Sequence, residues 1–126
     1  RTMTKLPDTV QQAWTDRNGA IVFATVGADG MPNAIYATCV SLFDDEHLIV
    51  ADNFFNKTQA NIKAGSKGSV LFITKEGKSF QVKGTILYDT SGAYYTDMKD
   101  WNGTRPGHAA AVLCVDEVYS GATKLA

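Results

Sequence analysis

The sequence has little of several features that mark particular protein classes. Among 126 residues there are three prolines and two cysteines, and the 12 basic side chains nearly balance the 13 acidic ones, which leaves a net charge of −1. No apolar run approaches the roughly 18 residues of a membrane-spanning helix. A near-neutral charge provides no broad cationic surface for nucleic acid. We therefore expect neither a membrane protein nor a nucleic-acid-binding protein.

The cysteines and histidines are too few and too far apart for a metal centre. Cys39 and Cys114 each lie inside an apolar run, and His47 and His108 are not in ligand spacing, so the sequence predicts no metal site. We interpret both cysteines as small buried hydrophobic residues in a reduced cytoplasm, with a disulfide or a reactive thiol as the alternative. The first ten residues contain no apolar signal core, which also favours a cytoplasmic location.

What the chain does contain fits one globular domain over residues 1–126. Hydrophobic residues make up 44% of it and charged residues 20%, and a domain of this length buries roughly two thirds of its unfolded surface. No internal repeat or linker divides it. The spacing of Val10, Ala13 and Trp14 predicts a short amphipathic helix near the start.

Alternating and continuous apolar runs predict about six strands. We expect them at residues 20–26, 33–43, 47–51, 69–74, 79–88 and 110–115, with the last able to extend through Val118 and Tyr119. The first of these is apolar on both faces, which indicates a strand covered on both sides. Two more helices, at residues 57–64 and around residues 94–101, interrupt the strands. This order predicts a small antiparallel β-barrel of the mainly β or α+β class, not a parallel doubly wound sheet.

The segment over residues 51–62 carries the most specific chemical signal. An apolar strand ends there, and a polar and aromatic loop leads to Lys57 and Thr58 in the first turn of a helix. A cation, a hydroxyl and the unpaired amides of a helix start together suit a phosphate monoester. The alternative is that both side chains are solvated, as is common at helix starts.

The order of elements resembles the FMN-binding split-barrel family, which includes the pyridoxamine 5′-phosphate oxidases and small bacterial FMN-binding proteins. The resemblance covers residues 19–118. Its most specific piece is the pattern of Lys57, Thr58 and Asn61 after an apolar strand, to which the turn from Gly27 to Gly30 adds. The resemblance implies a homodimeric split β-barrel of about six antiparallel strands with short helices, and FMN as the cofactor.

The resemblance also implies which positions contact FMN. Lys57 and Thr58 would hold the phosphate, the second strand would line the ribityl chain and ring, and the end of the third strand would contact the ring edge. Gln81 and Lys83 would direct donors toward the cofactor, and the region of Trp101 and His108 would reach the flavin of a second subunit. The candidate cofactor-binding residues are Tyr36, Ala37, Thr38, Ala51, Asp52, Asn53, Lys57, Thr58, Asn61, Gln81, Lys83 and Trp101.

These side chains also have purely structural interpretations. Tyr36 is also typical of a core, and the helical spacing of Trp101 favours the core for this ring, since large aromatic rings supply much of the buried area of a domain. Gln81 and Lys83 are equally typical of a solvated barrel face, because they alternate with apolar residues along their strand.

One part of the family pattern is missing. Pyridoxamine 5′-phosphate oxidases carry a basic pair, R-x-x-x-x-K, on the second strand, where this sequence has the neutral run from Ile35 to Val40. We therefore expect a flavin-dependent oxidoreductase or electron-transfer protein with a small-molecule or protein redox partner, and not a true pyridoxamine 5′-phosphate oxidase. The alternatives are a non-catalytic module for FMN, a deazaflavin or haem, and a dimeric barrel without a cofactor. No acid–base catalyst is assigned.

Overall fold

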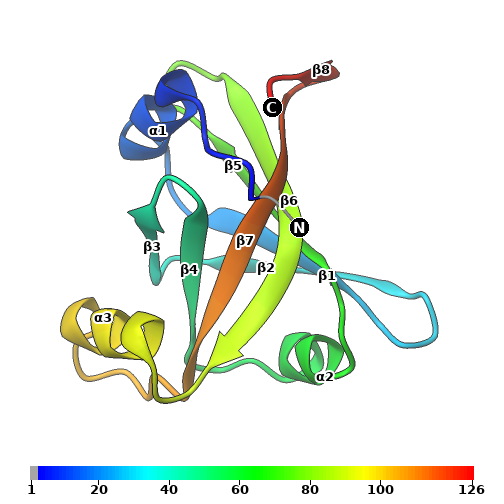
Figure 1. Ribbon diagram of the computed structural model, residues 1–126, viewed down its shortest axis with the longest axis vertical. Coiled ribbons are helices and arrows are strands. Elements are labelled where there is room, and N and C mark those ends of the chain that lie inside the picture. The colour runs from blue at the N-terminus through cyan, green and yellow to red at the C-terminus, as the bar shows by residue number, and fades with distance from the viewer. Residues whose placement is uncertain (1–2) are drawn as a thin grey trace.

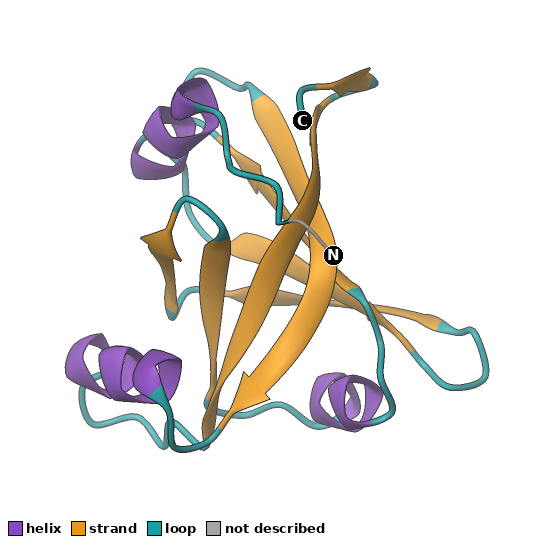
Figure 2. Ribbon diagram, viewed as in Figure 1, coloured by secondary structure: helices purple, strands orange, loops and turns teal. Residues whose placement is uncertain are grey.

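The computed structural model describes residues 3–126 and shows one strongly curled antiparallel sheet with short helices at its margins (Figures 1 and 2). Within these residues there are three helices and eight strands. In chain order they are α1 (Asp8–Thr15), β1 (Ile21–Val26), β2 (Pro32–Ala37), β3 (Val40–Asp44), β4 (His47–Asp52), α2 (Lys57–Lys63), β5 (Gly68–Ile73), β6 (Ser79–Asp89), α3 (Ala93–Trp101), β7 (Ala109–Ser120) and β8 (Thr123–Lys124). The predicted helices and the extension of the last strand are confirmed.

The two edge strands of the sheet are neighbours in the sequence. The strands follow the order β2-β1-β5-β6-β7-β4-β3, with β8 added beside β7. β2 and β3 therefore stand at opposite ends of this path, yet only Thr38 and Cys39 separate them along the chain. Two residues span on the order of 10 Å at most, so the sheet has to curl until its edges meet (Figure 1).

The sequence predicts one continuous strand over residues 33–43, and this is wrong. β2 ends at Ala37 and pairs with β1, whereas β3 begins at Val40 and pairs with β4. Val40 is buried, and the Cys39 carbonyl accepts a hydrogen bond from the Ala51 N–H at 2.9 Å. The apolar pattern continues through the point at which the chain changes its strand partner. Because the prediction used this pattern alone, it could not locate the break.

The main core fills the inside of the curled sheet. Phe23 and Leu113 are fully buried there, and α1 closes one end with Val10 and Trp14. The Trp14 ring packs edge-on against Phe72 with 5.2 Å between ring centroids. Full burial of a side chain of this size contributes about 1.5–3 kcal/mol, so the amphipathic pattern of α1 is explained by its role as a plug.

A smaller apolar cluster lies on the outer face of β4 and β7, beneath α3. It consists of Ile49, Ala51, Met98, Ala110 and Val112. Cys39 and Cys114 pack at its margin and are partly exposed, so their interpretation as buried residues is wrong. The two thiols are not joined in a disulfide.

Strands β6 and β7 approach each other closely at a bulge. Their register shifts between Lys83 and Gly84. A Cβ atom added at Gly84 would lie 1.8 Å from the carbonyl oxygen of Cys114, a distance that no real contact tolerates. Glycine is therefore required at position 84 for the two long strands to pair.

Candidate ligand-binding site

A cavity of about 320 Å³ lies where the two edges of the sheet meet. Residues 35–39, from the end of β2 and the connection after it, form one wall. Ala51 of β4 and Asn53 just after this strand form another, and Phe54, Phe55 and Arg105 complete the cavity. Its volume falls at the lower end of the range of roughly 300–1,000 Å³ that is usual for small-molecule sites. The cavity therefore has the size and position of a ligand pocket.

Two aromatic rings at the cavity are unusually exposed. Tyr36 is 80% exposed and Phe54 is 83% exposed, whereas the neighbouring Phe55 ring is half-buried and packs 6.0 Å from Phe23. Exposed aromatic side chains grouped at a concave site are typical of surfaces that bind a ligand or a second protein. The Tyr36 ring is not packed in the core, so its interpretation as a core residue is wrong.

The loop that carries Arg105 is held against the cavity by a pair of buried amides. The Asn53 amide donates to the Asn102 side-chain oxygen at 3.1 Å, and the Asn102 amide donates back to the Asn53 oxygen at 2.8 Å. The Gly107 N–H donates to the same Asn53 oxygen at 2.9 Å. The Asn53 side chain thus makes its hydrogen bonds within the chain, although the residue lines the cavity.

Asp52 is fully buried and does not line the cavity. Its carboxylate accepts hydrogen bonds from the Phe55 N–H at 3.0 Å, the Gln59 amide at 3.0 Å and the Tyr88 hydroxyl at 2.5 Å. Burial of the hydroxyl, and then its hydrogen bond to Asp52, raise the pKa of Tyr88 to about 12. Asp52 therefore fixes the loop that presents Phe54 and Phe55, which is a positioning role.

The phosphate candidates on α2 lie in two environments. Lys57 is exposed at the first residue of α2, two residues after Phe55 of the cavity wall. Thr58 is 1% exposed, and its hydroxyl accepts a hydrogen bond from the Asn33 amide at 3.0 Å. Asn61 donates to the Thr25 hydroxyl at 3.0 Å. Thr58 and Asn61 thus fasten α2 to β1 and β2, and their contact with a phosphate stays a prediction.

Gln81 and Lys83 are not brought to this cavity. They line a separate groove of about 330 Å³ on the outer face of β1, β5 and β6. The strand register nevertheless places Gln81 in one row with Leu71, Val22 and Tyr36, in that order across β6, β5, β1 and β2. Strands lie about 4.8 Å apart, so Gln81 stands on the order of 14 Å from Tyr36 on the same face.

Trp101 lines a third groove, of about 400 Å³, that continues from the cavity. The two spaces share Thr38, Cys39 and Arg105. The Trp101 ring packs against the smaller cluster, and its indole N–H donates to the Asp97 carboxylate at 3.0 Å. Trp101 therefore packs on an apolar cluster on one side and lines a groove on the other, and its contact with a flavin stays a prediction.

Sequence reasoning did not place Arg105, Phe54 and Phe55 among the candidate site residues. Only local features of the sequence could have pointed to these residues. Arg105 is a cation in a loop that contains glycine and proline, and both phenylalanines follow the end of a strand. In the described part of the chain, no three metal-ligating side chains gather. Over residues 3–126, no helix is long and apolar enough to cross a membrane.

The comparisons with known proteins agree with one another. A family model described as pyridoxamine 5′-phosphate oxidase matches residues 6–119. An uncharacterized protein of Methanocaldococcus jannaschii is 33% identical over 109 residues, which are 82% of this chain and 73% of that protein.

Two solved structures show the same fold. HupZ of Group A Streptococcus has a TM-score of 0.79 at 26% identity, over 91% of this chain and 93% of that one. An FMN-binding protein from Syntrophomonas wolfei has a TM-score of 0.72 at 17% identity, over 92% and 97%. The expected split-barrel fold is thereby confirmed. Since the family model spans nearly all of the curled sheet and its helices, the chain belongs to the pyridoxamine 5′-phosphate oxidase family.

Proposed function

We propose that the protein binds FMN in the cavity at the junction of β2 and β3 and works as a flavin-dependent oxidoreductase or electron-transfer protein. The observation that carries this proposal is the composition of the cavity wall. Tyr36, Ala37, Thr38, Ala51 and Asn53, which the family resemblance implies as FMN contacts, all line this one space. The similarity in fold to an FMN-binding protein supports it.

The residues present suit the two chemically different parts of FMN. Ile35, Ala37 and the two phenylalanine rings provide flat apolar surface for a tricyclic ring, and the Thr38 hydroxyl provides a hydrogen-bonding group beside it. Arg105 in the wall and Lys57 just beyond Phe55 provide cations for a phosphate. An apolar wall with a few polar groups and an adjacent cation is the usual composition of a cofactor site.

The protein's part in the reaction is to bind and orient. FMN, when bound, supplies the redox chemistry itself, so no protein acid or base is required. Asp52 and Asn53 hold the cavity wall in place through their buried hydrogen bonds. Tyr36 and Phe54 limit the access of water to the ring, and the groove beside Trp101 leads from the cavity to solvent and admits a redox partner.

We also propose that a second copy of the chain covers the outer face of the sheet. Leu71 is 42% exposed and Val26 is 47% exposed, and with Val22 and Tyr36 they form an apolar strip across three strands. An isologous dimer through this strip would cover the second face of β1, which the sequence pattern indicates to be apolar. It would also bring Gln81 and Lys83 of one copy near the cavity edge of the other.

Titration calorimetry with FMN, riboflavin, FAD, a deazaflavin and haem tests the proposal. We expect FMN to bind most tightly, because the site combines apolar walls with cations for one terminal phosphate. The absorption spectrum of the complex then shows whether NADH or NADPH bleaches the flavin. Tighter binding of haem or of a deazaflavin would replace FMN as the ligand, and binding of none of the five would overturn the proposal.

A further inference from the structure

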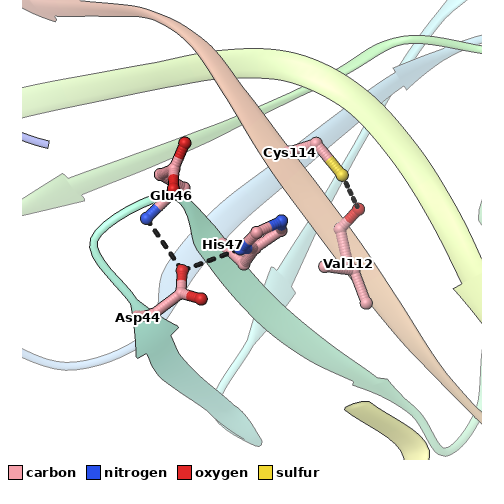
Figure 3. Close-up of polar contacts among 5 residues, drawn as sticks. All are labelled: Asp44, Glu46, His47, Val112 and Cys114. Atoms are coloured by element: carbon pink, nitrogen blue, oxygen red, sulfur yellow. Dashed lines mark hydrogen bonds and ion pairs between the residues drawn. The ribbon is translucent and has the colours of Figure 1, made fainter. Parts of the chain in front are cut away.

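Asp44, His47 and Cys114 lie near one another at the end of β4 that is far from the cavity (Figure 3). A carboxylate and an imidazole can exchange protons, and a thiol can also be oxidised. Oδ1 of Asp44 and Nδ1 of His47 are 2.7 Å apart. The same carboxylate oxygen accepts the N–H of Glu46 at 2.8 Å, which fixes it in the turn between β3 and β4. Cys114 is the direct partner of His47 across the β4–β7 pair.

His47 and Cys114 point to the same side of the sheet. Along β4, Leu48 belongs to the main core and Ile49 to the smaller cluster on the outer face. Along β7, Val112 and Cys114 belong to that same outer side. Strand side chains alternate between faces, so His47 shares the face of Ile49 and Cys114. Direct cross-strand partners have Cβ atoms about 4.5–5.5 Å apart, which makes the imidazole and the thiol neighbours.

The carboxylate orients the imidazole for this neighbour. Asp44 engages Nδ1, so the other ring nitrogen is the one available for exchange with a thiol. Figure 3 shows His47 between Asp44 and the strand that carries Cys114. The Cys114 thiol also donates to the Val112 carbonyl oxygen, at 3.9 Å.

The site has an aromatic wall and is open to solvent. The rings of Phe43 and Tyr94 lie 4.7 Å apart, and the Tyr94 ring lies 5.2 Å from His47. Both His47 and Cys114 are partly exposed. Neither residue is fully buried, so small reagents are suitable probes of this site.

Most of the other groups around the thiol are acidic or neutral, and the exposed Lys5 lies on the N-terminal segment whose backbone bonds to Val115 and Asp45. Asp44 and Glu46 belong to the turn before β4, and Thr85 is the partner of Cys114 on β6. Burial, followed by the negative charge of Asp44, raises the pKa of Tyr94 on α3, so this hydroxyl stays neutral at pH 7. Asp116, two residues further along β7, lines the separate groove with Gln81. Among these groups, His47 is the one that can act as a base toward the thiol.

From this geometry we infer that Cys114 is a hydroperoxide-reactive thiol, with His47 as its proton acceptor and Asp44 as the residue that positions His47. The arrangement follows the logic of an activated nucleophile, in which a base takes the proton and a third group orients the base. It lies at the opposite end of β4 from the cavity and does not depend on a bound cofactor.

The proposed reaction balances without a further component. The Cys114 thiolate attacks one oxygen of the hydroperoxide, a sulfur–oxygen bond forms and the oxygen–oxygen bond breaks. The leaving hydroxide or alkoxide takes the proton from the His47 imidazolium and departs as water or an alcohol. Sulfur is oxidised by two electrons to a sulfenic acid, and the peroxide is reduced by the same two.

Cys39 is too distant to form a disulfide with the product. Its carbonyl contacts Ala51, whereas Cys114 pairs with His47, four residues earlier on β4. At about 3.3 Å per residue this is on the order of 13 Å, beyond the roughly 7 Å limit between Cα atoms in a disulfide. A low-molecular-weight thiol is therefore required to reduce the sulfenic acid, first to a mixed disulfide and then to the thiol.

Alkylation by iodoacetamide tests the inference on the intact protein. Trypsin places the two cysteines on separate peptides, residues 18–57 and 100–124, so mass spectrometry measures each rate in one sample. The alkylation rate is measured between about pH 5 and 9. Below neutral pH, we expect Cys114 to react about tenfold faster in the folded protein than in the chain unfolded by guanidinium. We expect His47→Gln to remove this advantage and Asp44→Asn to reduce it, while the rate at Cys39 stays constant as the internal control.

Trapping with dimedone after addition of hydrogen peroxide tests the chemistry. We expect the adduct on peptide 100–124, and no adduct there in His47→Gln at the same peroxide exposure. If Cys114 of the folded wild-type protein reacts no faster than the unfolded chain at any pH, the inference is wrong, whatever the variants do. Fast alkylation without a dimedone adduct overturns the assignment of hydroperoxide as the substrate class. Circular dichroism shows whether each variant is folded.

Discussion

The Tyr88 hydroxyl donates a hydrogen bond to the fully buried carboxylate of Asp52, and so joins the end of β6 to the end of β4. Gln59 on α2 donates to both groups, at 3.0 Å to the carboxylate and 2.8 Å to the Tyr88 oxygen. Three elements thus converge on one buried charge. The loop with Phe54 and Phe55 owes its position to this network.

Replacement of Tyr88 by Phe should destabilise the protein by about 1.5–3 kcal/mol at pH 7, because a hydrogen bond to a charged group is lost. The raised pKa of Tyr88, about 12 when folded, gives this bond a pH dependence. Its contribution is fully present below the ordinary tyrosine pKa near 10 and is lost as pH rises through about 12. Urea unfolding followed by circular dichroism measures both effects.

The pH dependence of the Tyr88→Phe variant can contradict this assignment to Tyr88. If Tyr88→Phe loses free energy of unfolding between about pH 10 and 12 as steeply as the wild type does, another group is responsible for the alkaline instability. The matched control is Tyr36→Phe, since the Tyr36 ring is largely exposed. This variant should keep the wild-type alkaline profile.

Lys57→Ala should weaken the binding of FMN by roughly 1.5–3 kcal/mol and leave the binding of riboflavin nearly unchanged, because only FMN carries the phosphate. Lys63→Ala is the control, since Lys63 is an exposed lysine on the same helix and lies over the Tyr88 ring. Titration calorimetry with both ligands measures the difference. An equal loss for FMN and riboflavin would show that Lys57 does not contact the phosphate.

Leu71→Arg should convert the proposed dimer to a monomer. Leu71 is the exposed member of the apolar strip on β5, between Val22 and Gln81, and two copies related by a two-fold axis would place like charges in the interface. Light scattering measures the mass. Leu125→Arg, at an exposed leucine near the C-terminus, should leave the dimer intact. A mass of one chain for the wild type with FMN bound would refute the homodimer.

Pyridoxamine 5′-phosphate should not bleach or reduce the bound flavin at a useful rate. The segment from Ile35 to Cys39 along the cavity carries no charge, so a second phosphorylated ligand lacks an ionic partner on this wall and forfeits orientation. Arg105 is the cation that could replace the missing pair. Anaerobic stopped-flow spectroscopy decides the point, and rapid bleaching would restore the oxidase assignment.

Much of this fold can be predicted from local patterns. The helix at Val10, Ala13 and Trp14 and the hairpin after Val26 form where apolar spacing and glycine predict them. The break at Thr38 and Cys39 could not be predicted, because it depends on which distant strand each half meets. Strand pairing is a property of the closed sheet, whereas the apolar pattern is a property of the segment.

The candidate site was predicted in part for a similar reason. Tyr36, Ala37 and Thr38 line the cavity because a strand end and its neighbours stay together in any register. Thr58 is buried against Asn33, a contact between α2 and β2 that no spacing along the chain reveals. Arg105 reaches the cavity because buried amides hold its loop, and that depends on tertiary structure alone.

The short connection between the two edge strands also couples occupancy of the cavity to the integrity of the barrel. Thr38 and Cys39 both join the edges and line the cavity. A ligand that binds only the closed form stabilises it by RT ln(1 + [L]/Kd). Cleavage by a protease at this connection requires the edges to separate, and a saturating ligand opposes that separation. The rate of proteolysis at residues 38 and 39 therefore reports ligand binding without any spectroscopic signal from the ligand.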